Sequence, residues 1–372
     1  MGKHLVLIGG GHAHMMTLAS LGEFIARGHG VTVIGPSPYH YYSGMGAGML
    51  AGIYRPEEIR FATRQVVESQ GGVFVPGSVA RIDPATKTVH LADGGTIPYD
   101  VLSCNAGSFV PRTLPGAATF GDLFTVKPIE KLMDARQRLL ALGAQGPIRI
   151  AVIGGGPSAL EIAGGAWRLL RDAGAAADIT IFAGRQFLGP LPEAVRQRAR
   201  RSLARRGIGI VEATYVRELR NGNVVLDGGV AHAADVIFLA LGIKPSGIFS
   251  DSGLPVGPDG GLLVNEYLQC PEYPEIFGGG DCIHFAPQPL DKVGVYAVRQ
   301  NPVLRHNLLA ALEGGTLRSF VPGGEYLLIY NLGDDTGIFR KRWLVFGGGP
   351  AFLLKDYIDR RFMHRFQALE QR

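Results

Sequence analysis

The sequence predicts an α/β fold of two Rossmann-like domains followed by a C-terminal α+β segment. The first observation is an apolar run at residues 5–8 that leads directly into three glycines at 9–11. Such a run is typical of a strand buried on both faces of a parallel sheet. The second observation is that the pattern returns, with an apolar run at 148–153 and three glycines at 154–156. A strand, a glycine turn and a helix in this order form the context in which G-x-G-x-x-G binds a dinucleotide.

Both glycine turns fit the dinucleotide motif, the second one more completely. Gly9 and Gly11 occupy the first two motif positions, and His14 stands where the third Gly or Ala is expected, so the helix cannot lie quite as close to its strand. In the second turn the three positions are filled by Gly154, Gly156 and Ala159. Glycines in such a turn let backbone N–H groups approach a phosphate at the start of the helix. Two turns indicate either two bound dinucleotides or one dinucleotide and a duplicated relic.

Length and composition indicate a globular protein with more than one domain. A chain of 372 residues is expected to form two or three domains. Hydrophobic residues make up 46% and charged residues 19%, which argues against a disordered chain. No secretory signal and no run of about 18 apolar residues is present in the sequence, so we expect no segment that spans a bilayer. The three cysteines form no C-x-x-C motif, which favours a reducing, cytoplasmic compartment. We expect no metal site and no nucleic-acid partner.

Each predicted domain lacks the acidic residue that usually binds the ribose hydroxyls after the second strand. After the strand at 31–34 the chain continues without an acid to Ser37, so Ser37 or a backbone group must substitute. After the strand at 178–182 it continues to Arg185. An arginine at this place can accept a 2′-phosphate, which tilts the expected preference slightly toward NADPH.

Small residues follow two further predicted strands, in the segments 100–108 and 235–242. In the first of these segments, Ala106 and Gly107 would let the chain pass close to a bound cofactor. The matching segment in the second half shows that the two halves repeat more than their glycine turns.

A third glycine cluster and an aromatic loop complete the predicted site. The cluster closes on Gly280 and Asp281, and we expect the carboxylate to face sugar or ribityl hydroxyls. The loop at 39–45, which contains Ser43, is rich in aromatic and small residues and is well placed to border a flat ring system. Ordinary packing of these aromatic side chains is the alternative interpretation.

The C-terminal segment is predicted to combine strands and a helix. Strands are expected at 326–330 and 342–346 with a turn at 333–337 between them, and an amphipathic helix at 352–366. The net charge of +5 can be assigned entirely to residues 339–372. Such a helix can lie in a membrane interface, or it can dock on its own domain or on a partner.

The order and spacing of these features resemble the two-dinucleotide-domain flavoproteins of the pyridine nucleotide-disulfide oxidoreductase superfamily. Within it, the sequence looks most similar to the branch of type II NADH:quinone dehydrogenases and sulfide:quinone reductases. More narrowly, it resembles the NADH-dehydrogenase-like module found fused to selenide, water dikinase. The motifs that carry this resemblance are Gly-Gly-Gly-His-Ala-His at 9–14, Ser-Pro-Tyr at 37–39, Tyr-Ser-Gly-Met at 42–45 and Val-Tyr-Ala-Val-Arg-Gln at 295–300.

The resemblance implies FAD on the first glycine turn and NAD(P)H on the second. It implies an FAD-binding domain made of residues 1–112 and 263–320, an NAD(P)-binding domain at 113–262, and C-terminal strands and an amphipathic helix at 321–372. The expected cofactor-binding residues are Gly9, Gly11, His12, Ala13, Ser37, Ser43, Ala106, Gly107, Gly154, Gly156, Ala159, Arg185, Gly280 and Asp281.

Three side chains are expected to be catalytic because they match family positions. Glu161 matches the glutamate after the second glycine turn of the quinone reductases, where it would relay protons or orient the nicotinamide. Lys127 matches the lysine of the crossover between the domains. Gln300 falls where these enzymes place a glutamine at the flavin–quinone edge.

The resemblance therefore implies an enzyme, an FAD-dependent NAD(P)H dehydrogenase that reduces a quinone-like small molecule. Contact of residues 352–372 with a membrane surface would place it peripherally on the inner face of the membrane. One alternative is a sulfide or selenium-compound oxidoreductase that uses Cys104 or Cys282, and another is a flavin-binding protein with a vestigial nicotinamide site. Residues 39–52 contain no cysteine, which argues against a disulfide reductase.

Overall fold

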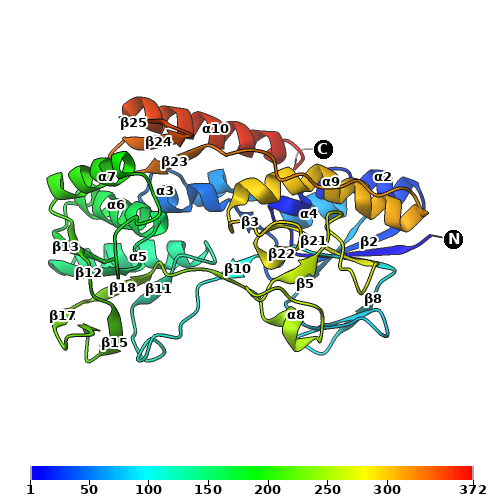
Figure 1. The fold of residues 1–372 in the computed structure, drawn as a ribbon, viewed down its shortest axis with the longest axis horizontal. Coiled ribbons are helices and arrows are strands. Elements are labelled where there is room, and N and C mark those ends of the chain that lie inside the picture. Colours follow the sequence, from blue (N-terminus) through cyan, green and yellow to red (C-terminus); the bar gives the residue numbers. More distant parts are fainter. Residues whose placement is uncertain (1, 371–372) are drawn as a thin grey trace.

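The computed structural model describes residues 2–370 and shows two lobes, each built on a five-stranded parallel sheet (Figure 1). The first sheet runs in the order β21 (Ile276–Gly278), β9 (Val101–Cys104), β1 (His4–Ile8), β2 (Gly30–Gly35) and β5 (Val73–Pro76). The second sheet runs in the order β11 (Leu123–Thr125), β18 (Val236–Leu239), β12 (Ile148–Ile153), β13 (Ala177–Phe182) and β14 (Gly209–Val211). The predicted α/β architecture with two similar sheets is confirmed. The first sheet takes strands from both sides of the second in sequence, so the chain leaves the first lobe and returns to it.

The central strands are apolar because nearly all their side chains are buried, on both faces of each sheet. On the first lobe the covering helices are α1 (Met15–Leu18), α2 (Leu21–Ala26), α4 (Thr63–Ser69) and α9 (Gly294–Glu313). On the second they are α5 (Lys131–Gly143), α6 (Pro157–Asp172) and α7 (Glu193–Arg205). Each lobe has its own hydrophobic core, and the strand residues of β1 and β12 lie at the centres of the two cores.

Helix α6 is packed unusually closely, because glycines stand where it meets its neighbours. A Cβ on Gly164 would lie 2.2 Å from the Leu332 carbonyl oxygen, and one on Gly165 would lie 2.9 Å from the Ala47 carbonyl oxygen. Ala47 belongs to α3 (Gly46–Leu50), which packs on α5 and α6. The two glycines thus let α6 join the first lobe to the C-terminal segment.

Smaller sheets decorate both lobes and connect them. Three-stranded antiparallel sheets are formed by β6 (Val79–Asp83), β7 (Thr88–Leu91) and β8 (Thr96–Pro98), and by β15 (Val216–Arg220), β16 (Asn223–Leu226) and β17 (Ala231–Ala233). Two-stranded pairs are β3 (His40–Tyr41) with β4 (Arg60–Phe61), and β20 (Leu262–Val264) with β22 (Ile283–Phe285). The pair β10 (Ser108–Phe109) and β19 (Lys244–Pro245) joins the two passages between the lobes, and α8 (Ile248–Asp251) follows it.

The C-terminal segment forms a three-stranded sheet and a long helix. The strands are β23 (Leu328–Asn331), β24 (Gly337–Lys341) and β25 (Leu344–Gly348), and α10 (Gly349–Gln367) follows. The prediction of two strands with Gly337 in the turn between them was wrong, because Gly337 begins a third strand. Arg342 was predicted in a strand, but it has φ of +53° and lies in the turn from β24 to β25. No helix among the described residues is long and apolar enough to cross a membrane.

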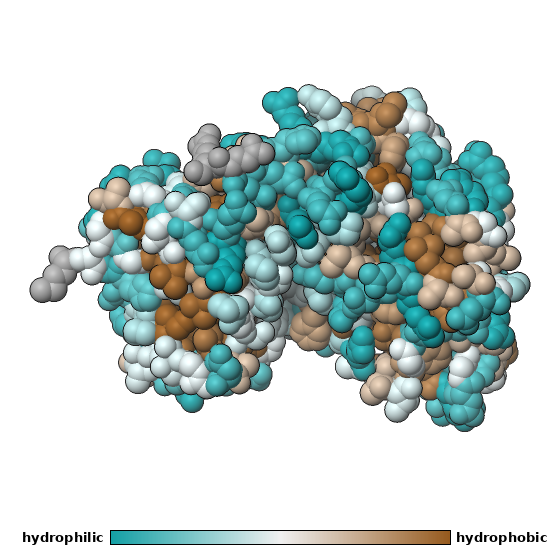
Figure 2. Space-filling view, turned by 180° about the vertical axis from the view of Figure 1, so that it is seen from behind, coloured by the Kyte–Doolittle hydropathy of each residue, from teal (hydrophilic) through white to brown (hydrophobic). Residues whose placement is uncertain are grey.

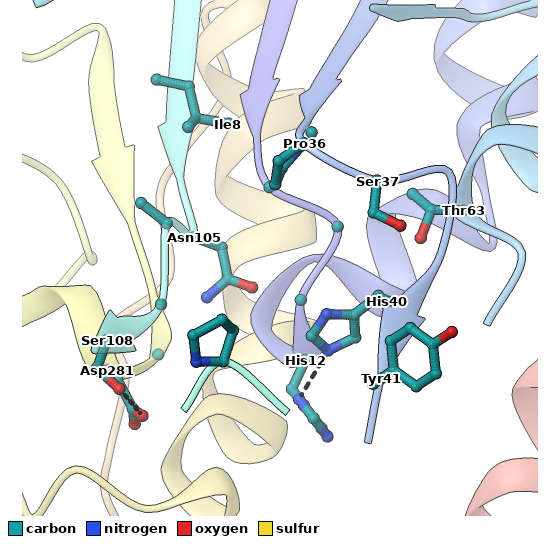
Figure 3. Close-up of a pocket in the computed structure, with 18 of the residues that line it drawn as sticks. Ile8, His12, Pro36, Ser37, His40, Tyr41, Thr63, Asn105, Ser108 and Asp281 are labelled. Carbon is teal, nitrogen blue, oxygen red and sulfur yellow. Dashed lines mark hydrogen bonds between the residues drawn. The ribbon is translucent and has the colours of Figure 1, made fainter. Parts of the chain in front are cut away.

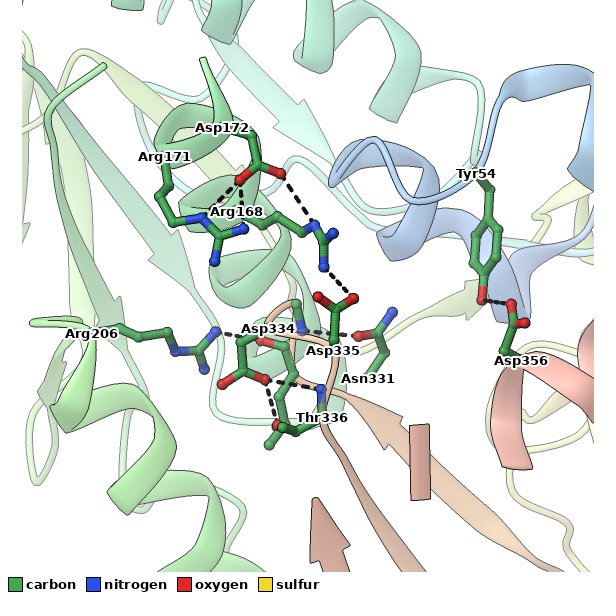
Figure 4. A network of polar contacts seen from close by, with 12 residues as sticks. Tyr54, Arg168, Arg171, Asp172, Arg206, Asn331, Asp334, Asp335, Thr336 and Asp356 are labelled. Carbon is green, nitrogen blue, oxygen red and sulfur yellow. Dashed lines mark hydrogen bonds and ion pairs between the residues drawn. The ribbon is translucent and has the colours of Figure 1, made fainter. Parts of the chain in front are cut away.

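Polar contacts fasten this segment to the second lobe (Figure 4). Arg168 of α6 pairs with Asp335 at 2.5 Å, and Arg206 donates to the carbonyl oxygen of Leu332. On the other side, the Tyr54 hydroxyl donates to Asp356 of α10 at 2.9 Å. Helix α10 therefore docks on its own chain, which is one of the three outcomes left open above, while Leu353 and Tyr357 stay exposed.

Candidate active site

A cavity of about 400 Å³ lies at the carboxyl ends of the first sheet (Figure 3). This edge of an open parallel sheet is where α/β folds bind their ligands. The walls come from the turn after β1, the loops after β2, β9 and β21, and the Lys127–Pro128 turn between β11 and α5 of the second lobe. Both lobes thus contribute to one cavity.

The first glycine turn can form only with glycine. Gly9 has φ of +85°, and a Cβ there would lie 2.4 Å from the Asn105 carbonyl oxygen. A Cβ on Gly11 would lie 2.3 Å from the Oδ1 atom of Asn105. The backbone of the turn is therefore exposed to the cavity without any side chain to cover it.

Asn105 is a site residue that we did not single out from the sequence. Its Nδ2 atom donates to the Gly279 carbonyl oxygen at 2.7 Å, while its buried Oδ1 atom has no partner among the described residues. A polar residue directly after β9 is the sequence signal for this site, but the small residues that follow it are the stronger pattern. An unpaired buried acceptor beside the cavity is suited to a ligand hydroxyl or N–H group.

His14 holds the glycine turn in place. It is completely buried, with Nδ1 2.6 Å from the Gly9 carbonyl oxygen and Nε2 2.8 Å from the Ser103 hydroxyl. Burial lowers the pKa of His14 to about 4, so the ring is neutral. The residue that departs from the motif therefore adds a bridge between the turn and β9.

An ion pair closes the cavity toward the second lobe. Lys127 Nζ lies 2.6 Å from Asp281 Oδ2, and the Ser108 hydroxyl donates to the same oxygen at 2.8 Å. Burial raises the pKa of Asp281, but Lys127 and the Ser108 hydroxyl outweigh it and hold that pKa below its usual value. The pair places one fixed cation and one fixed anion in the cavity wall.

Two histidines meet on the opposite wall. His40 Nε2 lies 3.4 Å from His12 Nδ1, and the Nε2 atom of His12 has no partner among the described residues. Burial lowers the pKa of His12 to about 3 and the pKa of His40 to about 4, so both rings are neutral at pH 7. Sequence reasoning marked His12 but not its pairing with His40.

The second glycine turn is open above the start of α6. Gly154 has φ of +145°, and a Cβ there would lie 2.2 Å from the Ala240 carbonyl oxygen. A Cβ on Gly156, the residue before α6, would meet nothing within 4 Å. The loop that carries Arg185 folds back onto this turn, since the Leu188 N–H donates to the Gly155 carbonyl oxygen at 2.7 Å. Arg185 itself is exposed.

Comparison with known proteins decides the family. A family model described as pyridine nucleotide-disulphide oxidoreductase matches residues 3–302. The chain belongs to this family.

Relatives and solved structures cover nearly the whole chain. Demethylphylloquinone reductase NdbB of Synechocystis is 25% identical over 379 aligned positions, covering 97% of this chain and 92% of that protein. NDH2 of Plasmodium falciparum, solved in complex with NADH, superposes with a TM-score of 0.83 at 13% identity, covering 99% of this chain and 97% of the other. Sulfide:quinone oxidoreductase of Aquifex aeolicus superposes with a TM-score of 0.80 at 20% identity, covering 99% of this chain and 92% of that protein. At these identities the two structures establish the fold, and the family establishes an NAD(P)H-dependent flavin oxidoreductase.

The residues of the cavity fit the FAD that the family implies. The bare glycine turn can approach a pyrophosphate, and the unpaired Asn105 oxygen can accept from a ligand hydroxyl. The predicted residues that line the cavity are Gly9, Gly11, His12, Ser37, Ser43, Ala106, Gly107, Lys127, Gly280 and Asp281. Ala13 is fully buried and lies outside the cavity lining. The individual roles of these residues stay predictions.

Two predicted catalytic residues lie outside this cavity. Gln300 is buried, and its Oε1 atom accepts the Gly280 N–H at 2.7 Å. Glu161 accepts the Asn331 N–H at 2.8 Å, close to Lys355 and Asp359 of α10. Burial raises the pKa of Glu161 and Lys355 opposes this effect, with a net upward shift. Of the three, only Lys127 faces the cavity.

The cysteines are poorly placed for redox chemistry at this cavity. Cys104, Cys270 and Cys282 are all buried, and none lines the cavity. The Cys282 thiol lies 3.3 Å from the Cys104 carbonyl oxygen, and burial raises its pKa to about 11. A thiol that stays protonated and buried is a poor nucleophile, so the geometry does not favour a thiol-based sulfide oxidoreductase.

Proposed function

We propose that this protein passes an electron pair from NAD(P)H through FAD to a quinone-type acceptor. The observation that carries the proposal is the single cavity formed by both lobes, in which the glycine turn of the first lobe faces the Lys127–Asp281 pair. The similarity to demethylphylloquinone reductase over 97% of the chain supports the choice of acceptor.

The residues of this chain position the reactants, while FAD, when bound, takes a hydride from the nicotinamide and releases the electron pair to the acceptor. The two glycine turns would hold the pyrophosphates at the starts of their helices. Helix α9 begins with its positive end at Gly294, which lines the cavity, and would stabilise negative charge on a reduced ring there. Residues that hold the nicotinamide against the flavin would make the transfer effectively unimolecular.

Glu161 belongs to a polar group that connects α6, α10 and the loop after β3. Lys355 Nζ lies 2.6 Å from Asp359 and 2.8 Å from the Gly44 carbonyl oxygen, and the Tyr42 hydroxyl donates to Asp359 at 3.0 Å. The raised pKa of Glu161 brings its protonation closer to neutral pH. We infer that Glu161 exchanges a proton or orients the nicotinamide, that Gln300 fixes the Gly280 turn, and that Lys127 orients the flavin.

We also propose a peripheral contact between the C-terminal segment and a membrane surface. Three large side chains there are exposed to solvent: Trp343 by 87%, Leu353 by 66% and Tyr357 by 59%. Hydrophobic residues gather on the ridge that this segment forms, at the upper right of Figure 2. Lys341 and Arg342 lie beside Trp343 in the hairpin turn and would attract anionic headgroups. Gln371 and Arg372, the end of the predicted contact at 352–372, lie outside the described residues.

Steady-state assays of the FAD-loaded protein test the proposal. NADH and NADPH are each supplied with menadione or a short-chain ubiquinone as acceptor, and oxidation of the nicotinamide is followed. We expect oxidation that depends on the quinone with at least one of the two donors. Oxidation that proceeds with oxygen or ferricyanide but with neither quinone would contradict the proposed acceptor.

A further inference from the structure

The wall of the cavity that faces α10 contains a buried ring nitrogen without a partner. His12 is only 8% exposed, and its Nε2 atom has no hydrogen bond among the described residues. Buried polar atoms nearly always have hydrogen-bond partners. A buried atom without one therefore indicates a place where a ligand can bind. In Figure 3 the ring of His12 extends below His40, away from Ser37 and Thr63.

The surroundings of this nitrogen are aromatic. Phe362 of α10 stacks on His12 with ring centres 5.7 Å apart and planes 11° apart. The ring centre of Tyr42 lies 5.1 Å from that of His12. Phe61 stacks on His40 with ring centres 6.4 Å apart. Phe362 thus covers one face of the imidazole with a flat apolar ring. Aromatic walls with one polar atom suit a planar carbonyl compound.

His12 is also connected to the cavity through His40. The 3.4 Å contact joins Nδ1 of His12 to Nε2 of His40, and His40 is half-buried and lines the cavity. A neutral imidazole carries a donor on one nitrogen and an acceptor on the other. If His40 Nε2 donates to His12 Nδ1, the proton of His12 resides on Nε2, the atom without a partner.

The charged groups around the pair keep both rings neutral. Burial and His40 lower the pKa of His12, Lys127 lowers it further, and Asp281 opposes them. Burial and Lys127 lower the pKa of His40. From α10, Asp359 accepts the hydroxyl hydrogen of Tyr42, so this carboxylate is engaged with Tyr42 and Lys355.

We propose that His12 and His40 form a two-imidazole path that delivers a proton from solvent to the carbonyl oxygen of a quinone-type acceptor beside His12 Nε2. The inference rests on the proposed function, whose balance is NAD(P)H + H⁺ + quinone → NAD(P)⁺ + quinol. NAD(P)H supplies the two electrons and one proton, and the His12–His40 pair supplies the other proton. The N–H bond at His12 Nε2 breaks as the O–H bond of the quinol forms, His12 Nδ1 takes the proton of His40 Nε2, and His40 Nδ1 takes one from water.

The experiment compares acceptors that do and do not need a proton. His12→Phe, His12→Gln and His40→Gln are assayed with menadione and with ferricyanide, which accepts electrons without protons. The control is His90→Gln on β7, a histidine that does not line the cavity. We expect menadione reduction to fall at least about tenfold in the His12 variants, since a positioned acid contributes about 10²–10⁴-fold. Both rates are normalised to bound FAD, and the ratio of menadione to ferricyanide rates should fall in the His12 variants but stay within about twofold of the unmodified value in the His90 variant.

A second readout does not depend on turnover. In protein labelled with ¹⁵N-histidine, addition of menadione should shift the Nε2 resonance of His12 and leave that of His14 in place. An unchanged ratio of menadione to ferricyanide rates in His12→Phe, or no shift at Nε2, overturns this inference while leaving the proposed function intact. An unmodified protein that reduces ferricyanide but not quinones overturns the proposed function and this inference with it.

Discussion

Replacement of Gly156 by alanine separates nucleotide binding from folding. Gly156 precedes α6 with φ of −90° and ψ of −179°, a conformation that alanine adopts without strain. The added methyl group meets no atom within 4 Å in the protein. Alanine at an unstrained glycine position stabilises by about 0.4–1 kcal/mol through the unfolded state, and its weaker N-cap propensity opposes this by a similar amount. We therefore expect an almost unchanged melting temperature.

In the proposed nucleotide site, the same methyl group would stand where a pyrophosphate approaches the N–H groups of α6. Loss of one hydrogen bond to a charged group costs about 1.5–3 kcal/mol, which corresponds to a Kd about ten- to a hundredfold higher. The assay is titration of the flavin fluorescence or absorbance with NADH and NADPH under anaerobic conditions, beside a melting curve. Gly228→Ala is the matched control. A Cβ on Gly228 also meets no atom within 4 Å, and Gly228 lies in the turn between β16 and β17, away from both glycine turns. A Gly156→Ala protein with unchanged Kd for both nucleotides would refute the assignment of the second glycine turn.

Three further predictions follow from the same geometry. Gly9→Ala combines a strained φ of +85° with a backbone clash, so we expect it to lose at least about 1 kcal/mol of stability and to purify with less FAD, measured by its visible absorbance. Asp281→Asn removes the partner of Lys127, and because the pKa of Asp281 is lowered in the fold, its stabilisation is present above the unfolded pKa and disappears as the pH falls through the folded pKa. The melting temperatures of this variant and the unmodified protein should therefore differ at pH 7 and converge only as the pH falls below the unfolded pKa of about 3.9; a constant difference would argue against the ion pair as the cause. Trp343→Ala combined with Leu353→Ser should reduce co-sedimentation with anionic vesicles severalfold without changing menadione reduction in solution, and unchanged sedimentation would remove the membrane contact.

Local patterns carried the parts of the fold that could be predicted. The four residues before Gly9 and the four before Gly154 are apolar and buried, because these parts of the strands are covered on both faces, and the glycines after them are required by backbone approach. The strand Gly337–Lys341 was not predicted, because its apolar part is only two residues long, Ile338 and Phe339, and directly follows the predicted turn at 333–337. The true turn depends on Arg342 in a left-handed conformation, which is uncommon for arginine and has no sequence signal.

Contacts between distant segments could not be predicted in the same way. The Asn105 side chain is placed by the Gly279 carbonyl, and the ring of His12 is placed by His40 and by Phe362 of α10. These partners lie far apart in sequence and share no periodic pattern. The residue pattern located the glycine turns and Asp281, but it gave no information on the unpaired atoms of Asn105 and His12.

The central claim is that one chain connects a nicotinamide donor to a quinone through the flavin. The most direct test is anaerobic double mixing, in which the FAD-loaded protein first meets NADH or NADPH and then menadione, while the visible band of the flavin is followed. We predict that at least one donor bleaches the band within the turnover time and that menadione restores it. A flavin that neither nucleotide bleaches, or a bleached flavin that menadione does not reoxidise, would contradict the account.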